Sequence, residues 1–362
     1  MPDYYIGLMT GTSLDGIDTA LVDFSDAHPR LIAALGMPLD KDLRAELLVL
    51  QASGPDELHR AALAANALSR ACAESVTQLL KKTGIQEEQI RAIGNHGQTL
   101  RHQPQSGYTL QIGNHALLAE LTGISVVGDF RSRDVAAGGQ GAPLVPAFHH
   151  AIFGKATETR VLVNVGGIAN LTILPAGGKV TGWDSGPGNV LMDLWIQRHQ
   201  GCPYDDNGAW AASGIVLPDL LQTLLNEPWF SLPAPKSTGR DLFHARWLDA
   251  MLNNRKDKPQ DVQATFCALT ARTIADAARA ARPATLYLCG GGAHNATLIA
   301  MLAQELPQTR ISTTAELGVD PDWVEAYAFA WLARCCIERI PANLPAVTGA
   351  SGPRILGAIY PS

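Results

Sequence analysis

The stretch that decides the fold lies at the N-terminus, where residues 4–24 read YYIGLMTGTSLDGIDTALVDF. Residues 4–9 and 17–24 are rich in aliphatic and aromatic side chains and flank a polar, glycine-containing turn. This pattern predicts a strand, a tight turn and a second strand. Consecutive amides in such a turn form a concave anion site, and hydroxyls add donors. For one turn alone, however, an ordinary glycine hairpin is the favoured interpretation.

The same pattern returns in the second half of the chain. Residues 160–165 (RVLVNV) and 168–174 (IANLTIL) are β-prone and flank the pair Gly166-Gly167. A hairpin with a small-residue turn therefore opens each half, and we predict a duplicated architecture.

A third glycine turn, residues 290–292, follows the apolar strand pattern TLYLC at 285–289. A helix is predicted to follow from about Asn295. Glycines between a buried strand and a helix N-terminus allow close backbone approach and offer amide donors, which suits a nucleotide. The P-loop pattern GxxxxGK[ST] and the dinucleotide pattern GxGxxG are both absent from the sequence, which argues against those two classes.

Length and composition limit the remaining classes. The 362 residues are 46% hydrophobic and 17% charged, which indicates a packed chain of about two domains. A formal charge of -6 gives no electrostatic reason to expect nucleic acid or an anionic membrane. The N-terminus has no basic region before an apolar core, and the six cysteines show no CxxC spacing. We expect a cytoplasmic α/β enzyme with neither a nucleic acid nor a membrane as partner.

Six strings occur in one order along the chain: GLMTGTSLDGID, GNHGQT, GDFRSRDVAAGGQGAPLVP, LVNVGGIANLT, DSGPGN and LCGGGAHN. Together they resemble the anhydro-N-acetylmuramic acid kinases, within the superfamily of actin, hexokinase and Hsp70. The resemblance covers nearly the whole chain. It implies a two-domain, actin-like ATPase (ribonuclease H-like) α/β fold, with duplicated mixed sheets, flanking helices and a central cleft.

The glycine-rich loop after residue 130 is the expected crossing between the two domains. The first domain is then residues 1–135 plus 345–362, which carry the first phosphate hairpin. The second domain is residues 136–344, which carry the second phosphate hairpin, a catalytic aspartate and the adenosine motif.

The resemblance also implies an activity. The chain would use ATP to open 1,6-anhydro-N-acetylmuramic acid hydrolytically and to phosphorylate O6, which gives N-acetylmuramic acid 6-phosphate in peptidoglycan recycling. The implied co-substrate is ATP with Mg²⁺, and a homodimer is implied by the resemblance alone. Two alternatives remain open: another sugar or carboxylate kinase of the same fold without ring opening, and a non-catalytic, ATP-gated scaffold.

The nucleotide site follows from the resemblance. The residues placed around the phosphates and adenosine are Gly11, Thr12, Ser13, Leu14, Asp15, Gly16, Ile17, Asp18, Gly166, Gly167, Gly290, Gly291, Gly292 and Asn295. Many superfamily members carry an aspartate where this chain has Gly7, so Asp15 or Asp18 would organise Mg²⁺ through water, since the ion surrenders its hydration shell reluctantly. Asp18 could equally be a solvent-facing strand residue.

Asp184 stands in GWDSGPGN, after a strand-like segment and before a helix expected to start near Pro187. A carboxylate at such a turn could accept a proton in a cleft, or it could merely cap the helix. The residues leave both interpretations open. The resemblance places the family's catalytic aspartate on Asp184.

The substrate that the resemblance implies carries a lactyl carboxylate, so the sugar pocket should contain a cation. Arg131, on the glycine-rich loop, is the expected contact because its guanidinium fork suits an anion. A surface salt bridge with Asp129 or Asp134 is the alternative for this arginine.

Further positions are candidates for contacts to the sugar. Glu325 could bond sugar hydroxyls or assist the base, or it could be a first-turn acid favoured by the helix dipole. Thr99 and His96 follow a predicted strand, at a strand end where α/β sheets place ligand groups. His96 is slightly favoured as a structural histidine.

Overall fold

The computed structural model describes the whole chain except residues 1, 12–13, 15, 27, 240–241 and 254. The chain forms two compact units: one contains residues 1–152 and 323–362, and the other contains residues 153–322. Each unit has its own sheet and its own core of buried apolar side chains. Within the described ranges, no helix has both the length and the apolar character required to cross a membrane.

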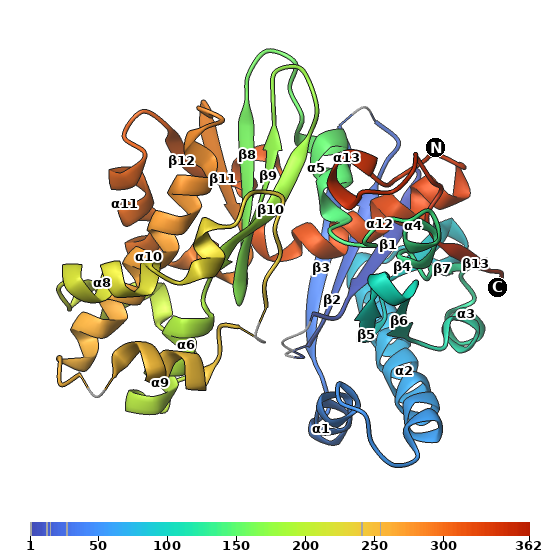
Figure 1. Cartoon of the computed structure of the whole chain (residues 1–362). Coiled ribbons are helices and arrows are strands. Elements are labelled where there is room, and N and C mark those ends of the chain that lie inside the picture. The colour runs from blue at the N-terminus through green and yellow to red at the C-terminus, as the bar shows by residue number, and fades with distance from the viewer. Residues whose placement is uncertain (1, 12–13, 15, 27, 240–241, 254) are drawn as a thin grey trace. The chain divides into compact units, whose positions relative to one another are not determined.

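The first unit is built on a six-stranded sheet in the order β13-β7-β4-β1-β2-β3 (Figure 1). β1, β2 and β3 form an antiparallel meander, β4 runs parallel to β1, and β7 runs parallel to β4. β13 lies at the edge, antiparallel to β7. The strands are β1 (Tyr4–Met9), β2 (Gly16–Asp23), β3 (Arg30–Pro38), β4 (Ile90–Asn95), β7 (Val126–Gly128) and β13 (Ala358–Tyr360).

The second unit has a five-stranded sheet in the order β10-β9-β8-β11-β12. β8, β9 and β10 form an antiparallel meander, and β11 and β12 extend the sheet in parallel with β8. Apart from the edge strand β13, both sheets thus have the order third, second, first, fourth, fifth, which confirms the predicted duplication. The strands are β8 (Arg160–Val165), β9 (Ile168–Leu174), β10 (Thr181–Pro187), β11 (Thr285–Cys289) and β12 (Arg310–Thr313).

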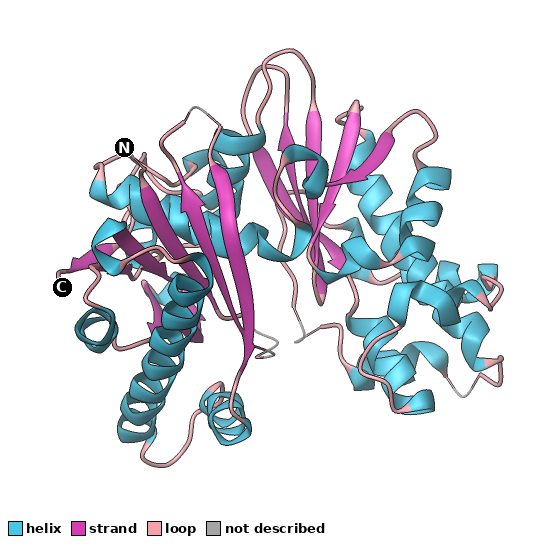
Figure 2. Ribbon diagram, turned by 180° about the vertical axis from the view of Figure 1, so that it is seen from behind, coloured by secondary structure: helices cyan, strands magenta, loops and turns pink. Residues whose placement is uncertain are grey.

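Helices cover both faces of the first sheet, with α2 and α12 on opposite sides (Figures 1 and 2). A small antiparallel pair, β5 and β6, forms a separate two-stranded sheet. The elements are α1 (Lys41–Leu50), α2 (Glu57–Thr83), α3 (His115–Thr122), α4 (Ser132–Ala136), α5 (Val145–Phe153), α12 (Val324–Ile337), α13 (Pro345–Thr348), β5 (Gln98–Gln103) and β6 (Tyr108–Ile112).

Successive side chains of β1 point to opposite faces of the sheet, which explains how one helix packs on each face of this strand. Ile6 and Leu8 are fully buried in the core that includes α2. Gly7, between them, faces α12, because a Cβ there would collide with the carbonyl oxygen of Ala326. Gly94 of β4 permits the same close approach one turn further along α12. Position 7 is therefore a helix-packing position, which explains why it holds glycine.

The helices of the second unit enclose a core rich in aromatic side chains. The longest, α10, packs against β9 and β10 and against its neighbour α11. The helices are α6 (Val190–Gln200), α7 (Ala209–Ala212), α8 (Pro218–Leu225), α9 (Ala245–Leu252), α10 (Pro259–Arg279) and α11 (Ala296–Glu305).

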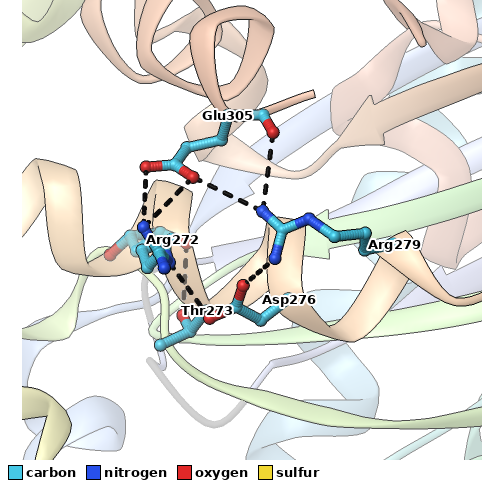
Figure 3. Close-up of polar contacts among 6 residues, drawn as sticks. Arg272, Thr273, Asp276, Arg279 and Glu305 are labelled. Atoms are coloured by element: carbon cyan, nitrogen blue, oxygen red, sulfur yellow. Dashed lines mark hydrogen bonds and ion pairs between the residues drawn. The ribbon is translucent and has the colours of Figure 1, made fainter. Parts of the chain in front are cut away.

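Charged side chains join the C-terminal ends of α10 and α11 (Figure 3). Arg272 and Arg279 each contact both Asp276 and Glu305. These side chains are 30–49% exposed, so each pair contributes about 0–1 kcal/mol. The apolar contacts beneath them hold the two helices together.

The unit boundaries differ from the expected domains. We expected residues 136–344 in the second domain, but the first unit continues to Ile152 and resumes at Trp323. The reason is α12, which packs on β1 and β4 and so belongs to the first unit despite its position late in the chain. The C-terminal strand returns to the first sheet as expected.

Candidate active site

Asp184 lies inside β10, which continues through Pro187 before α6 begins at Val190. The sequence predicted a helix that begins near Pro187. That prediction is wrong, because Pro187 is the last residue of β10 and the helix begins only at Val190. β10 pairs with β9, and the register shifts between Asp184 and Gly186. The cap position of α6 is Asn189. Asp184 therefore does not cap this helix, and the cap interpretation is excluded.

The carboxylate of Asp184 is half-buried and is held on one oxygen. The Ser237 hydroxyl and the Thr238 N–H each donate to Oδ2 at 2.9 Å. Among the described residues, Oδ1 has no hydrogen-bond donor. Burial raises the pKa of Asp184, and the two donors oppose that effect. The result is a carboxylate with one fixed oxygen and one oxygen available to accept a proton.

The hairpin of β8 and β9 is bonded through its turn to the DSGPGN string. The Asn189 N–H donates to the carbonyl oxygen of Gly166 at 2.8 Å, and the N–H groups of Gly188 and Val190 donate to that of Gly167. The close contact requires glycine at position 188, since a Cβ there would collide with the Gly166 carbonyl. The start of α6 is thereby fixed to the turn between β8 and β9.

The third glycine turn follows β11 and meets the end of β8. Gly290 has a φ of 74°, and a Cβ on it would collide with the side chain of Asn164. A Cβ on Gly292 would likewise collide with Val165. The Asn295 side chain accepts from the Leu298 N–H at 2.9 Å and so caps α11. Its contact to adenosine stays a prediction.

The first hairpin is only partly within the described residues, because Thr12, Ser13 and Asp15 lie outside them. Leu14 and Ile17 are fully buried, so only their main chains could contact a nucleotide. Asp18 is half-buried on β2, opposite Met9 and Gly36 in the neighbouring strands. Asp18 is thus not fully solvent-facing, and its Mg²⁺ role stays a prediction.

Arg131 is oriented by His96 and by the main chain. Its Nη2 lies 2.9 Å from Nε2 of His96, and its Nη1 donates to the Gly141 carbonyl at 2.9 Å. Asp134 is buried and bonded elsewhere, and among the described residues Arg131 forms no salt bridge with it or with Asp129. The surface-salt-bridge interpretation is therefore wrong. Burial, and then the charge of Arg131, lowers the pKa of His96 to about 3, so His96 is a neutral acceptor.

Glu325 lies in the first turn of α12, near Arg131. Burial raises the pKa of Glu325, and the positive charge of Arg131 opposes this. Burial also lowers the pKa of Arg131 to about 10, and Glu325 counteracts it. The structure thus brings Arg131, Glu325 and His96 together. Thr99 is half-buried on β5, and its hydroxyl accepts from the Gln111 side chain at 3.2 Å.

Sequence reasoning missed the segment that holds Asp184, residues 236–238. This Lys-Ser-Thr run follows a proline-rich stretch and has no strand or helix period. The polar side chains of this run were the only sign of a role in the site, and polar runs of this kind are common in loops.

The comparisons with known proteins agree along the whole length. The family described as anhydro-N-acetylmuramic acid kinase matches residues 3–362. The anhydro-N-acetylmuramic acid kinase of Nitrosomonas europaea is 57% identical over 363 residues, covering 99% of this chain and 100% of that protein. That of Pseudomonas putida is 55% identical over 361 residues, covering 99% of each.

A solved structure, component A of (R)-2-hydroxyglutaryl-CoA dehydratase from Acidaminococcus fermentans, is 12% identical. It aligns with 91% of this chain and 96% of its own, at a TM-score of 0.46. The fold assignment rests on the strand order of the two sheets and not on that likeness. The match over residues 3–362 shows that the chain belongs to the anhydro-N-acetylmuramic acid kinase family.

Proposed function

We propose that this chain uses ATP and water to convert 1,6-anhydro-N-acetylmuramic acid into N-acetylmuramic acid 6-phosphate, with Asp184 as the base. Family membership supports an ATP-dependent transferase acting on this sugar in peptidoglycan recycling. A kinase without ring opening, or a non-catalytic scaffold, does not explain why the chain matches this one family from end to end.

The reaction couples a hydrolysis to a phosphoryl transfer. Water attacks C1, the C1–O6 bond breaks, and its electron pair passes to O6. O6 then attacks the γ-phosphorus of ATP, and ADP leaves. The proton of the attacking water passes to Asp184. A separate general acid is unnecessary, since the leaving oxygen of the first step is the phosphoryl acceptor of the second.

The single observation that carries this assignment is the environment of Asp184. Two neutral donors hold Oδ2, and among the residues that the structure describes no cation contributes to the pKa of the carboxyl. A carboxylate with no counter-ion keeps its affinity for a proton, and burial increases that affinity. Oδ1 is therefore the atom that would take the proton from water.

Main-chain groups would make most of the nucleotide contacts. The amides of the first hairpin and of Gly166-Gly167 would bind the phosphates, and residues 290–292 would lie near adenosine. The fully buried side chains of Leu14 and Ile17 support this division. Asn295 would act by capping α11 and thereby fixing the adenosine turn.

The residues present also fit Mg²⁺. Among the described residues, no three acidic, histidine or cysteine side chains cluster as a metal cage. Mg²⁺ at nucleotide sites is held by phosphate oxygens, water and one or two carboxylates, so a single aspartate suffices. Asp18, or Asp15 outside the described residues, would hold it through water. When bound, the ion would neutralise charge on the β- and γ-phosphates.

Arg131 would bind the lactyl carboxylate of the sugar, and Glu325 and Thr99 would bond its hydroxyls. The orientation of Arg131 by neutral His96 supports this role, because His96 holds the guanidinium without cancelling its charge, which also acts on Glu325. We place the reaction in the cytoplasm, where ATP is available and where the six free cysteines would stay reduced. A homodimer stays a prediction.

The test of ring opening is a reaction in water labelled with ¹⁸O. We expect one ¹⁸O at C1 of the phosphorylated product and one ADP for each sugar consumed. N-acetylmuramic acid, the already open sugar, should be a poor acceptor. Unlabelled product incubated in the same water controls for exchange at C1. An unlabelled product, or equal ADP release with both sugars, would favour a kinase without ring opening.

A further inference from the structure

The contacts that hold Asp184 come from residues 236–238, which we call the strap. The Asp184 N–H donates to the carbonyl oxygen of Lys236 at 3.0 Å. The Ser237 hydroxyl and the Thr238 N–H then hold Oδ2. Three consecutive residues thus fix both the main chain and the side chain of Asp184. Whatever fixes the strap also fixes the base.

The strap is anchored to a short 3-10 helix, η4 (Pro228–Ser231). The ammonium of Lys236 donates to the carbonyl oxygens of Trp229 and Phe230, at 3.2 and 2.7 Å. It also lies 4.3 Å from the centroid of the Trp229 ring, and the indole N–H donates to the Ser237 carbonyl at 3.0 Å. Lysines usually keep their ammonium in water. Here burial lowers the pKa of Lys236, and main-chain carbonyls replace that water.

The anchor itself is firmly packed. Trp229 is 9% exposed and meets Phe230 and Phe243 edge-on, with ring centroids 5.5 and 5.9 Å away. Glu227, just before η4, accepts from the indole N–H of Trp247 at 2.8 Å. A close-packed aromatic cluster leaves little room for movement, so a segment bonded to it keeps one position.

Lys236 acts from the far side of β10. Its side chain lines a cavity of about 220 Å³ together with Trp183, whose side chain points to the face of β10 opposite Asp184. Asp276 of α10 also lines this cavity, but it is already bonded to two arginines of its own helix (Figure 3). The ammonium therefore reaches Asp184 only through the strap.

We propose that Lys236 is a positioning residue, which ties the strap to η4 and thereby keeps Ser237 and Thr238 on Oδ2 of Asp184. This inference rests on the proposed role of Asp184 as the base. Without the ammonium the strap loosens, the base is misplaced and its two donors are lost. Because these donors oppose the effect of burial on the pKa of Asp184, that pKa then rises.

The test is Lys236→Met in the full chain, which keeps the apolar stem and removes the ammonium. We expect kcat to fall roughly 10- to 100-fold, as for a base displaced by about 1 Å. KM for ATP and for the sugar should stay unchanged, and the acidic limb of the kcat profile should move to higher pH. Glu227 and Asp276, which are the acidic groups that the described residues place on the elements packed around the strap, keep their side chains in this variant. The exposed Lys179→Met is the matched control.

A loss of kcat that only tracks the fraction of folded protein, with the acidic limb unmoved, would overturn the inference. Lys236→Gln, which retains neutral donors, should move the limb less than Lys236→Met. It carries the same test if the methionine variant does not fold. Asp184→Asn is assayed alongside. If that variant stays active, the base assignment fails; if it is inactive while both Lys236 variants behave as wild type, only the positioning role fails.

Discussion

Asp184 in the second unit and Glu325 in the first are both half-buried carboxylates, and burial raises the pKa of both. They differ in which groups oppose the effect of burial on the pKa. Two neutral donors, Ser237 and Thr238, act on Asp184, whereas the full charge of Arg131 acts on Glu325. Neutral donors orient a carboxylate without a counter-ion, but a cation competes with any proton. The comparison therefore supports the proposal that Asp184 takes up the proton and that Glu325 binds the sugar.

The sharpest test of this contrast is Asp184→Asn. The amide keeps the shape and can still accept from the strap, but it cannot take a proton from water. We expect kcat to fall by roughly 10² to 10⁴, with binding of ATP and sugar retained in calorimetry. Asp249→Asn, which removes an exposed carboxylate of the same unit, is the control and should behave as wild type. Near-normal turnover of Asp184→Asn would end the assignment.

The next largest effect should come from Arg131→Met. Loss of a charge-assisted contact to the lactyl carboxylate, about 1.5–3 kcal/mol, should raise KM for the sugar about 10- to 100-fold. On an anhydro sugar that lacks the lactyl group, the variant and the wild type should have the same KM. An equal loss on both sugars would mean that Arg131 serves the fold and not the carboxylate.

Glu325→Gln should have a smaller effect of another kind. Replacing a hydrogen bond worth about 1 kcal/mol should raise KM for the sugar roughly fivefold. The acidic limb of the kcat profile should remain where it is in the wild type, because in the proposed mechanism Asp184 and not Glu325 takes the proton. If that limb shifts in Glu325→Gln, the two carboxylates titrate together, and the contrast drawn between Asp184 and Glu325 is wrong.

The smallest effect concerns stability. The folded-state pKa of Asp184 lies above its unfolded value, so the protonated form is the one that folding favours. The contribution of this carboxyl is present below the unfolded pKa and is lost as pH rises through the folded pKa. At neutral pH, Asp184→Asn should therefore melt at the same or a slightly higher temperature than the wild type. Any gain should vanish as pH falls below the unfolded pKa.

The elements around the site were predictable where their signals are local. Apolar runs beside small-residue turns predicted β1, β2, β8 and β9, and the glycines after TLYLC marked the third turn. The start of α6 was misplaced because proline suits both a helix first turn and a strand end. The place of α12 was also missed, since its partners β1 and β4 lie more than 200 residues earlier in the chain.

The partners of the candidate residues could not be predicted in the same way. Arg131 could have paired with a neighbouring aspartate, but the fold gives it His96, which lies in the turn between β4 and β5. The strap has no period and no recognisable motif, so nothing in its residues relates it to Asp184, more than 50 positions away.

By itself, the sequence determined the family and the doubled sheet, because these depend on local patterns and on strings that occur in one order, and it predicted Asp184 as the catalytic aspartate. Only the tertiary structure decided which oxygen of Asp184 accepts hydrogen bonds and which charge lies near Glu325. It also decided which carbonyl oxygens accept from the ammonium of Lys236. The physical reason is that the protonation and orientation of a side chain depend on atoms within a few ångströms in space. Such atoms come from distant parts of the chain, and only the folded molecule brings them together.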